Sequence, residues 1–173
     1  MTASLSLHYY YAQWSLGTVL LAFSPDGLCA ALPGDDRQAL LADLQKRHQR
    51  APLSPVTTDN DGRRAAALQA LEQAGSTLTP PLVPQGSEFQ RAVWRVLQTI
   101  PAGQTRTYGQ VAALLGKPAA TRAVASACAA NPIAVLIPCH RVLRADGGLG
   151  GFRWGLELKR ALLQRESAVT GAT

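Results

Sequence analysis

The residues with the clearest potential for chemistry are Cys139 and His140, which stand side by side in the segment Ile137-Pro138-Cys139-His140-Arg141. A free cysteine thiol has a pKa near 8.5, so only about 3% of it is thiolate at neutral pH. A neighbouring imidazole that takes the proton, together with nearby positive charge, raises that fraction. We therefore expect Cys139 to be a nucleophile that is ionised with the help of His140.

The segment before this pair determines where the sulfur lies. Residues 133–137 form a short apolar run, which predicts a buried strand. Pro138 prevents regular pairing and predicts a turn. The sulfur is then expected at the end of a rigid element, which suits a nucleophile better than a packing residue.

Two capping boxes predict helices in the second half of the chain. Ser87 with Gln90, and Thr107 with Gln110, each place a hydroxyl three residues before a glutamine. Trp94 follows the helical spacing of the first of these helices, so we expect it in the core.

The helix that begins after Thr107 is expected to be short and to end near Gly116. Val111, Leu114 and Leu115 are predicted on its buried side. A further helix is predicted over residues 119–130, and two short helices joined by a turn that contains glycine form a helix-turn-helix.

The helix predicted over residues 119–130 is rich in alanine. Alanine favours helices and close packing, which is one interpretation of this composition. The other is that a slim helix enters a narrow groove, such as the DNA minor groove of about 6 Å. Long side chains that read the major groove are nearly absent, which favours docking without sequence preference.

The first half predicts a small α/β domain. Its expected elements are strands over 5–13, 16–23 and 28–32, a turn over 24–27, a helix capped by Asp35 or Asp36, and a helix over 63–74. A proline-rich segment then reads as a linker. The predicted organisation is an N-terminal α/β domain with a small antiparallel sheet over 1–79, a linker over 80–86, and a mostly α domain with the helix-turn-helix over 87–173.

Charge is distributed unevenly between these halves. Residues 1–85 contain six basic and seven acidic residues, and residues 86–173 contain eleven and four, so the net charge of +6 comes from the second half. Solvated side chains on helix surfaces would account for it, but a polyanionic partner such as DNA is the better interpretation.

Cysteine and histidine positions argue against a metal or a disulfide framework. Cys29, Cys128 and Cys139 are an odd and scattered set, and His8 and His48 are isolated. We therefore expect no metal and a reducing, cytoplasmic setting. No apolar stretch approaches the ~20 residues that span a bilayer, and we expect no secretory signal.

The motif Pro138-Cys139-His140-Arg141 resembles that of O6-alkylguanine-DNA alkyltransferases of the bacterial type, including the C-terminal domain of Ada. The resemblance is strong from about 86 to 166 and is carried in order by residues 89–94, 107–112, 121–125 and 150–155. Residues 1–85 are similar only in length and texture.

This resemblance implies roles for five residues. Cys139 matches the alkyl acceptor, His140 the base that takes its proton through a water molecule, and Glu166 the carboxylate that orients His140. Asn131 matches a hinge residue, and Tyr108 a tyrosine that contacts the base and a phosphate. Glu157 is the rival carboxylate, but the register favours Glu166.

The resemblance also implies the residues that contact DNA and those that form the substrate pocket. Arg122 matches an arginine finger that fills the gap left by an extruded nucleotide. The other predicted DNA contacts are Tyr108, Thr107, Ala123, Ala125, Ser126 and Arg141. The predicted pocket residues are Cys128, Leu149, Gly150, Phe152, Arg153 and Trp154, although packing is the alternative role of Cys128.

The implied activity is repair of O6-alkylguanine, and of O4-alkylthymine, in double-stranded DNA, once per molecule and without a cofactor. We expect a monomer, with cooperative binding to DNA left open. The alternatives are a cysteine hydrolase, a DNA-binding regulator that does not need Cys139, a damage sensor, and an Ada-like coupling of repair to transcription.

Overall fold

The computed structural model describes residues 6–73 and 80–170. The chain divides into two compact units, Met1–Pro84 and Gln85–Thr173. The second unit contains all of the predicted site residues. The exact domain limits given by the sequence stay a prediction.

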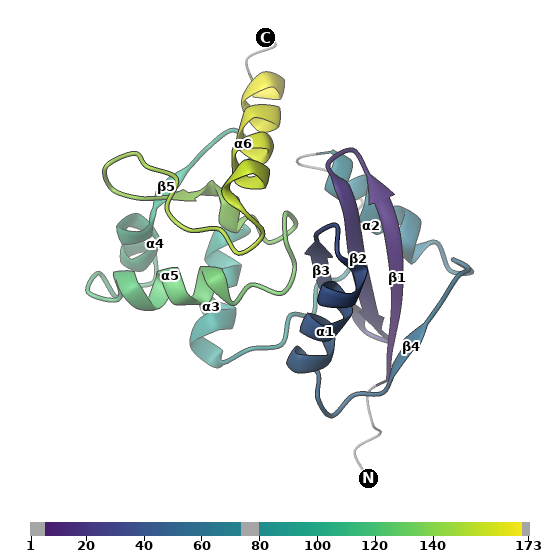
Figure 1. Ribbon diagram of the computed structural model, residues 1–173. Helices are drawn as coiled ribbons and strands as arrows, with labels where there is room; N and C mark the ends of the chain where they lie inside the picture. The colour runs from purple at the N-terminus through teal and green to yellow at the C-terminus, as the bar shows by residue number, and fades with distance from the viewer. Residues whose placement is uncertain (1–5, 74–79, 171–173) are drawn as a thin grey trace. The chain divides into compact units, whose positions relative to one another are not determined.

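A four-stranded sheet forms the centre of the first unit (Figure 1). Its strands are β1 (Leu7–Trp14), β2 (Gly17–Ser24), β3 (Gly27–Pro33) and β4 (Leu53–Pro55), in the order β3-β2-β1-β4. The three predicted strands are confirmed, although the predicted start at Leu5 lies outside the described residues. β4 was not predicted, because its three residues include a proline, and it pairs with β1 in parallel.

Two helices accompany this sheet, α1 (Arg37–Arg47) and α2 (Arg63–Glu72). Asp36, not Asp35, caps α1, because its side chain accepts a hydrogen bond from the backbone N–H of Ala39 at 3.1 Å. Leu40 and Leu44 are the buried residues of α1. Ala74, the predicted end of α2, lies outside the described residues.

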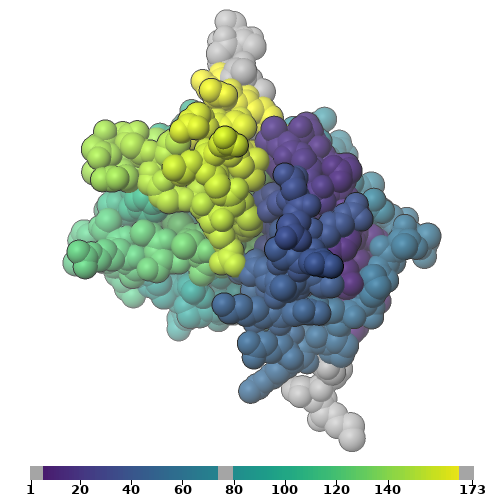
Figure 2. Space-filling view, in the orientation of Figure 1, coloured from purple at the N-terminus to yellow at the C-terminus, as the bar shows by residue number. Residues whose placement is uncertain are grey.

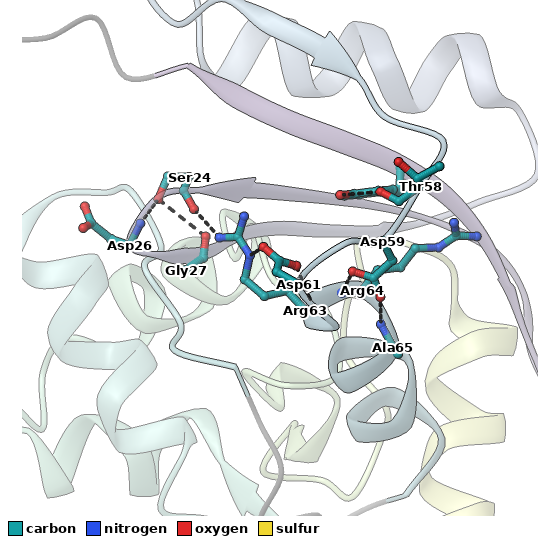
Figure 3. Close-up of polar contacts among 10 residues, drawn as sticks. Ser24, Asp26, Gly27, Thr58, Asp59, Asp61, Arg63, Arg64 and Ala65 are labelled. Atoms are coloured by element: carbon teal, nitrogen blue, oxygen red, sulfur yellow. Dashed lines mark hydrogen bonds and ion pairs between the residues drawn. The ribbon is translucent and has the colours of Figure 1, made fainter.

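The start of α2 is stabilised by two aspartates, because its N-cap residue is a glycine without a capping side chain. Asp59 accepts hydrogen bonds from the backbone N–H groups of Arg64 and Ala65. Arg63 bonds to Asp61 and donates from Nη1 to the carbonyl of Ser24 at 2.7 Å (Figure 3). These contacts connect the helix start to the end of β2.

The segment predicted to be a linker is attached to the sheet at its start. The Leu28 N–H donates to the carbonyl of Pro81 at 2.8 Å, and the Val83 N–H donates to the carbonyl of Leu28 at 2.9 Å. Residues up to Pro84 therefore belong to the first compact unit.

The second unit is mostly helical. Its elements are α3 (Glu88–Leu97), β5 (Arg106–Thr107), α4 (Tyr108–Leu114), α5 (Thr121–Ala129), the 3-10 helix η1 (Cys139–Arg141), β6 (Val142–Leu143) and α6 (Leu156–Thr170). α3, α4 and α5 pack together (Figure 1). Over residues 6–73 and 80–170 the chain forms six α-helices, and none of them is long and apolar enough to cross a membrane.

The helix starts and the core of this unit agree with the sequence. Both predicted capping boxes are present, at Ser87 and at Thr107. Trp94 is 1% exposed and its Nε1 donates to the carbonyl of Ala127 at 2.9 Å, which joins α3 to α5. β5 and β6 pair in parallel, with Thr107 opposite Leu143, so the start of α4 lies beside the segment that follows η1.

Two predictions for this unit are wrong. Leu114 is 60% exposed, because α4 ends there after only two turns and buries Val111 and Ala112 instead. Residues 133–137 are buried except for the partly exposed Leu136, but they form a turn with an isolated bridge, not a strand. Val135 has a φ of 71°, a conformation that a β-branched residue rarely adopts and that no strand contains.

We predict that Asp36→Ala lowers the free energy of unfolding by about 1 kcal/mol, because α1 loses its N-cap. Asp35→Ala is the matched control, because Asp35 is also exposed and this substitution removes the same charge without removing the cap. Urea unfolding of the intact protein measures both variants. Equal losses would show that charge, not the cap, is responsible.

Candidate active site

Asn131 organises the turn that carries the predicted nucleophile. It is fully buried, and its Oδ1 accepts a hydrogen bond from the Ile133 N–H at 2.9 Å. Its Nδ2 donates to the carbonyl of Ile137 at 2.8 Å and lies 3.2 Å from the sulfur of Cys139. One amide therefore closes the turn and contacts the thiol at its end.

Cys139 begins η1 and is 4% exposed. Burial raises the pKa of its thiol to about 11, although the hydrogen bond from Asn131 and the positive charge of Lys159 act in the opposite direction. The expectation of an increased thiolate fraction is therefore wrong for the resting protein. The sulfur is a thiol there, so a base must remove its proton before it can attack.

His140 and Arg141 both bond to the carboxylate of Glu166 on α6. The His140 Nε2 lies 2.8 Å from Glu166 Oε1, and both side chains are buried. Arg141 donates from Nε to Oε2 at 3.0 Å and from Nη2 to Oε1 at 2.7 Å. Its Nη1 donates to the carbonyl of Ile100. The two residues after the thiol are thus held by one carboxylate.

The ionisation of this group favours a neutral imidazole. Burial raises the pKa of Glu166, but hydrogen bonds from His140 and Arg141 outweigh it and the pKa falls to about 2. Burial lowers the pKa of His140, against the effect of Glu166. A neutral ring that donates from Nε2 leaves Nδ1 as an acceptor, and Nδ1 has no hydrogen-bond partner within the described part of the chain.

A hollow of about 330 Å³ has Cys139 in its wall. Its wall is formed by residues from four segments of the second unit: Tyr108, Ala125, Cys128, Ala129, Cys139, Gly151, Phe152 and Arg153. Burial raises the pKa of Tyr108 to about 12 and that of Cys128 also to about 12. Tyr108 therefore remains an O–H donor, and Cys128 is a neutral wall residue.

Not all of the predicted pocket residues line this hollow. Leu149 and Gly150 line a second, adjoining hollow. Trp154 lines neither of the two, and its ring packs edge-on against Phe152 at 5.4 Å between centroids. Its role there is to support Phe152.

Most of the predicted DNA contacts are accessible on the surface of the second unit. Arg122, Ala123 and Ser126 are exposed on α5, and Ala125 is partly exposed, so all four are accessible. Thr107 caps α4 with its side chain and is partly exposed.

Arg141 does not fit its predicted role as a DNA contact. Arg141 is only 8% exposed, and its guanidinium bonds to Glu166 and to the carbonyl of Ile100. A guanidinium held in this way is a structural partner of the carboxylate, not a phosphate ligand.

Lys159 is a site residue that the sequence reasoning missed. It is fully buried, and its Nζ donates to the carbonyls of Val142, Leu149 and Gly151. Its ammonium holds the loop that walls both hollows and acts on Cys139 electrostatically. The signal was its spacing, because Lys159, Leu162 and Glu166 recur every three to four residues on one face of α6.

The rest of the site offers no place for a metal. Within residues 6–73 and 80–170 no group of three or more His, Cys, Asp or Glu side chains is arranged to hold an ion. Cys29, Cys128 and Cys139 are all free thiols. The exposed Glu157 lies in the first turn of α6, so Glu166 is the carboxylate that meets His140.

These features combine a buried cysteine thiol, a histidine bonded to a buried carboxylate, and an open hollow lined by that cysteine. Comparison with known proteins identifies the family to which the chain belongs. Residues 88–168 match the family model of the 6-O-methylguanine DNA methyltransferase DNA-binding domain. The chain is 35% identical to a methylated-DNA–protein-cysteine methyltransferase of Methanosarcina acetivorans, over 94% of this chain and 99% of that protein.

The chain therefore belongs to the methylated-DNA–protein-cysteine methyltransferase family, as the resemblance predicted. It is also 45% identical to the bifunctional transcriptional activator/DNA repair enzyme Ada of Escherichia coli, over 95% of this chain and 46% of that protein. The chain thus spans about half the length of that relative.

A solved structure shares the fold along most of both chains. It is the crystal structure of Mycobacterium tuberculosis OGT in complex with DNA, with a TM-score of 0.75 and 34% sequence identity. The match covers 93% of each chain.

We predict that Glu166→Gln destabilises the protein by about 3–5 kcal/mol at pH 7, because Arg141 is left buried without a counter-charge. The folded-state pKa of Glu166 is about 2, below its unfolded value, so its contribution is present above about pH 4.5 and is lost as the pH falls towards 2. The difference between the two proteins should therefore shrink with acid.

Urea unfolding at pH 7 and pH 3 measures this effect. Glu157→Gln is the matched control, because it removes an exposed carboxylate from the same helix. An equal pH dependence of the wild type and Glu166→Gln would contradict the assignment.

Proposed function

We propose that this protein repairs DNA by direct reversal of alkylation. It transfers the alkyl group of O6-alkylguanine, and of O4-alkylthymine, in duplex DNA to Cys139, once per molecule and without a cofactor. The observation that carries the proposal is a hollow lined by Cys139, whose neighbour in the chain, His140, is held by a buried carboxylate.

The chemistry proceeds in one displacement. His140 takes the thiol proton of Cys139 at Nδ1, through a water molecule, and Glu166 stabilises the imidazolium that forms. The thiolate attacks the alkyl carbon, so a carbon–sulfur bond forms and the bond from carbon to O6 breaks. The base leaves as the guanine anion, to which the Tyr108 hydroxyl donates a hydrogen bond. The anion takes a proton from water, and the imidazolium of His140 returns its proton to water, so the charges balance. The raised pKa of Cys139 supports coupling of deprotonation to attack.

The thioether product is stable, and nothing in the site supports a second step that removes the alkyl group. Hydrolysis of the adduct would need an activated water on the far side of the same carbon. A single transfer per molecule is what the proposal requires, and repeated turnover on an ester would favour the cysteine hydrolase instead.

Access to the lesion is proposed through the minor groove. α4 and α5 act as a helix-turn-helix, and the small exposed residues of α5 allow a close approach to DNA. The lesion base turns out of the duplex into the hollow, at a cost of a few kcal/mol in lost stacking and pairing. Arg122, exposed at the start of α5, fills the gap, and Asn131 is the hinge between α5 and the thiol.

The setting proposed for this activity is the cytoplasm, where thiols stay reduced. The protein acts there as a monomer on double-stranded DNA. Two observations support DNA as the partner. The second half of the chain carries the net positive charge, and the structure of the M. tuberculosis relative was solved with DNA.

We predict that Cys139→Ala abolishes transfer from a duplex with O6-methylguanine, whereas DNA binding is retained. Intact-mass spectrometry should find one added methyl group on the wild-type protein, at Cys139, and none on the variant. Cys128→Ala is the matched control, because its thiol lines the same hollow and it should still accept the group. Transfer by Cys139→Ala would refute the proposal.

We predict that Arg122→Ala slows transfer from the duplex by about tenfold or more, because the flipped state loses a stacking and hydrogen-bonding partner. Arg91→Ala is the control, since Arg91 is an exposed arginine on α3. Single-turnover rates on duplex DNA measure both variants. Equal slowing in both would show a general effect of charge rather than a finger.

A further inference from the structure

A second hollow of about 580 Å³ adjoins the hollow over Cys139, and the proposed chemistry does not use it. The two hollows share Tyr108, Ala125 and Gly151 as common walls. The remaining wall of the second hollow is Arg144, Gly148, Leu149, Gly150, Leu156 and Arg160. Its residues come mostly from the loop before α6 and from α6, which form one continuous stretch of surface, light green to yellow in Figure 2.

The charge on this wall is positive. Arg144 and Arg160 are both exposed, one shortly after β6 and the other on α6. Asp146 pairs with Arg144 at 3.3 Å, but both side chains are 63% exposed, and an exposed pair of this kind contributes little. Asp146 does not line the hollow, and neither does any other carboxylate.

Gly150 keeps the two hollows close to each other. Its φ is +71°, and a Cβ at this position would lie 2.9 Å from the Tyr108 hydroxyl and 3.3 Å from Cγ of Arg144. Any side chain here would push against both residues. The tyrosine that contacts the first hollow and the arginine that lines the second therefore meet at this glycine.

This wall suits a phosphate better than a base. Guanidinium groups present a planar fork of N–H donors that matches phosphate oxygens. A base would need aromatic faces to stack on, and Tyr108 is the one aromatic residue of the wall. Because the hollow adjoins the substrate hollow, its anion must be joined closely to the base that enters there.

We propose that Arg144 and Arg160 form a subsite for a backbone phosphate of the lesion-bearing strand, beside the extruded nucleotide. This inference rests on the proposed function, and it makes the two arginines binding residues for the flipped state rather than for the chemistry. A substrate without a phosphate should then react independently of them.

The test compares two substrates in single-turnover transfer: a duplex with O6-methylguanine, and a free O6-alkylguanine base, as the methyl and the benzyl compound. The variant Arg144→Gln with Arg160→Gln should slow transfer from the duplex by about tenfold and lower the slope of log affinity against log salt by about one per lost phosphate contact. Transfer from the free base should be unchanged, which also shows that the variant is folded.

Two further variants sharpen the comparison. Asp146→Asn removes the carboxylate that pairs with Arg144 but keeps an oxygen for the Gly148 N–H, which bonds to Asp146 Oδ1 in the wild type. Because this exposed pair contributes little, the variant should leave transfer from the duplex nearly unchanged. Arg95→Gln is the matched control, because Arg95 is exposed on α3 and lines neither hollow. It should change the duplex rate less than twofold, as an exposed charge away from the site does.

The outcomes separate this inference from the proposed function. An unchanged duplex rate in the double variant, or a loss equal to that of Arg95→Gln, would overturn the phosphate subsite while transfer itself remained intact. A parallel loss on the free base would assign the arginines to the reactive pocket, which also overturns it. A wild-type protein that transfers from neither substrate would refute the proposed function instead.

Discussion

The site depends on one buried carboxylate, that of Glu166. It bonds to His140 and to Arg141, and Arg141 also donates to the carbonyl of Ile100, shortly after the end of α3. A buried ion pair is costly to desolvate, so it persists only where every partner is satisfied. Here the carboxylate fixes the orientation of the imidazole, keeps Nε2 as the donor, and connects α6 to the turn that carries the thiol. The Glu166 carboxylate therefore determines both the position of the His140 ring and which of its nitrogens carries the proton.

Asn131 solves a second problem, which is how to bury an irregular backbone. A turn that is not a strand leaves peptide groups unpaired, and unpaired buried groups are destabilising. The single amide of Asn131 bonds to the Ile133 N–H and the Ile137 carbonyl, and it reaches the sulfur of Cys139. The Val135 φ of 71° is held within this turn. The thiol is therefore placed by a polar side chain, not by strand pairing.

The features that sequence predicted well are those with local causes. Capping boxes at Ser87 and Thr107, the three strands of residues 7–33 and the core position of Trp94 follow from hydroxyl spacing and side-chain periodicity. The motif around Cys139 identified the family. The features that the sequence did not predict correctly depend on contacts with residues distant in the chain. An apolar run such as 133–137 looks the same whether its polar groups pair with a strand or with Asn131. The burial of Arg141 and Lys159 depends on acceptors supplied by distant residues, Glu166 and Leu149 among them.

The Lys159 ammonium binds the wall loop by its main chain alone, through the carbonyls of Val142, Leu149 and Gly151. Every amino acid supplies the same carbonyl, so the anchor does not depend on which side chains the loop carries. Side chains such as those of Leu149 or Arg153 can thus be replaced while the hydrogen bonds from Lys159 to the loop are kept. Evolution can therefore reshape the reach and polarity of the cavity lining through single substitutions, while the scaffold behind it stays constant.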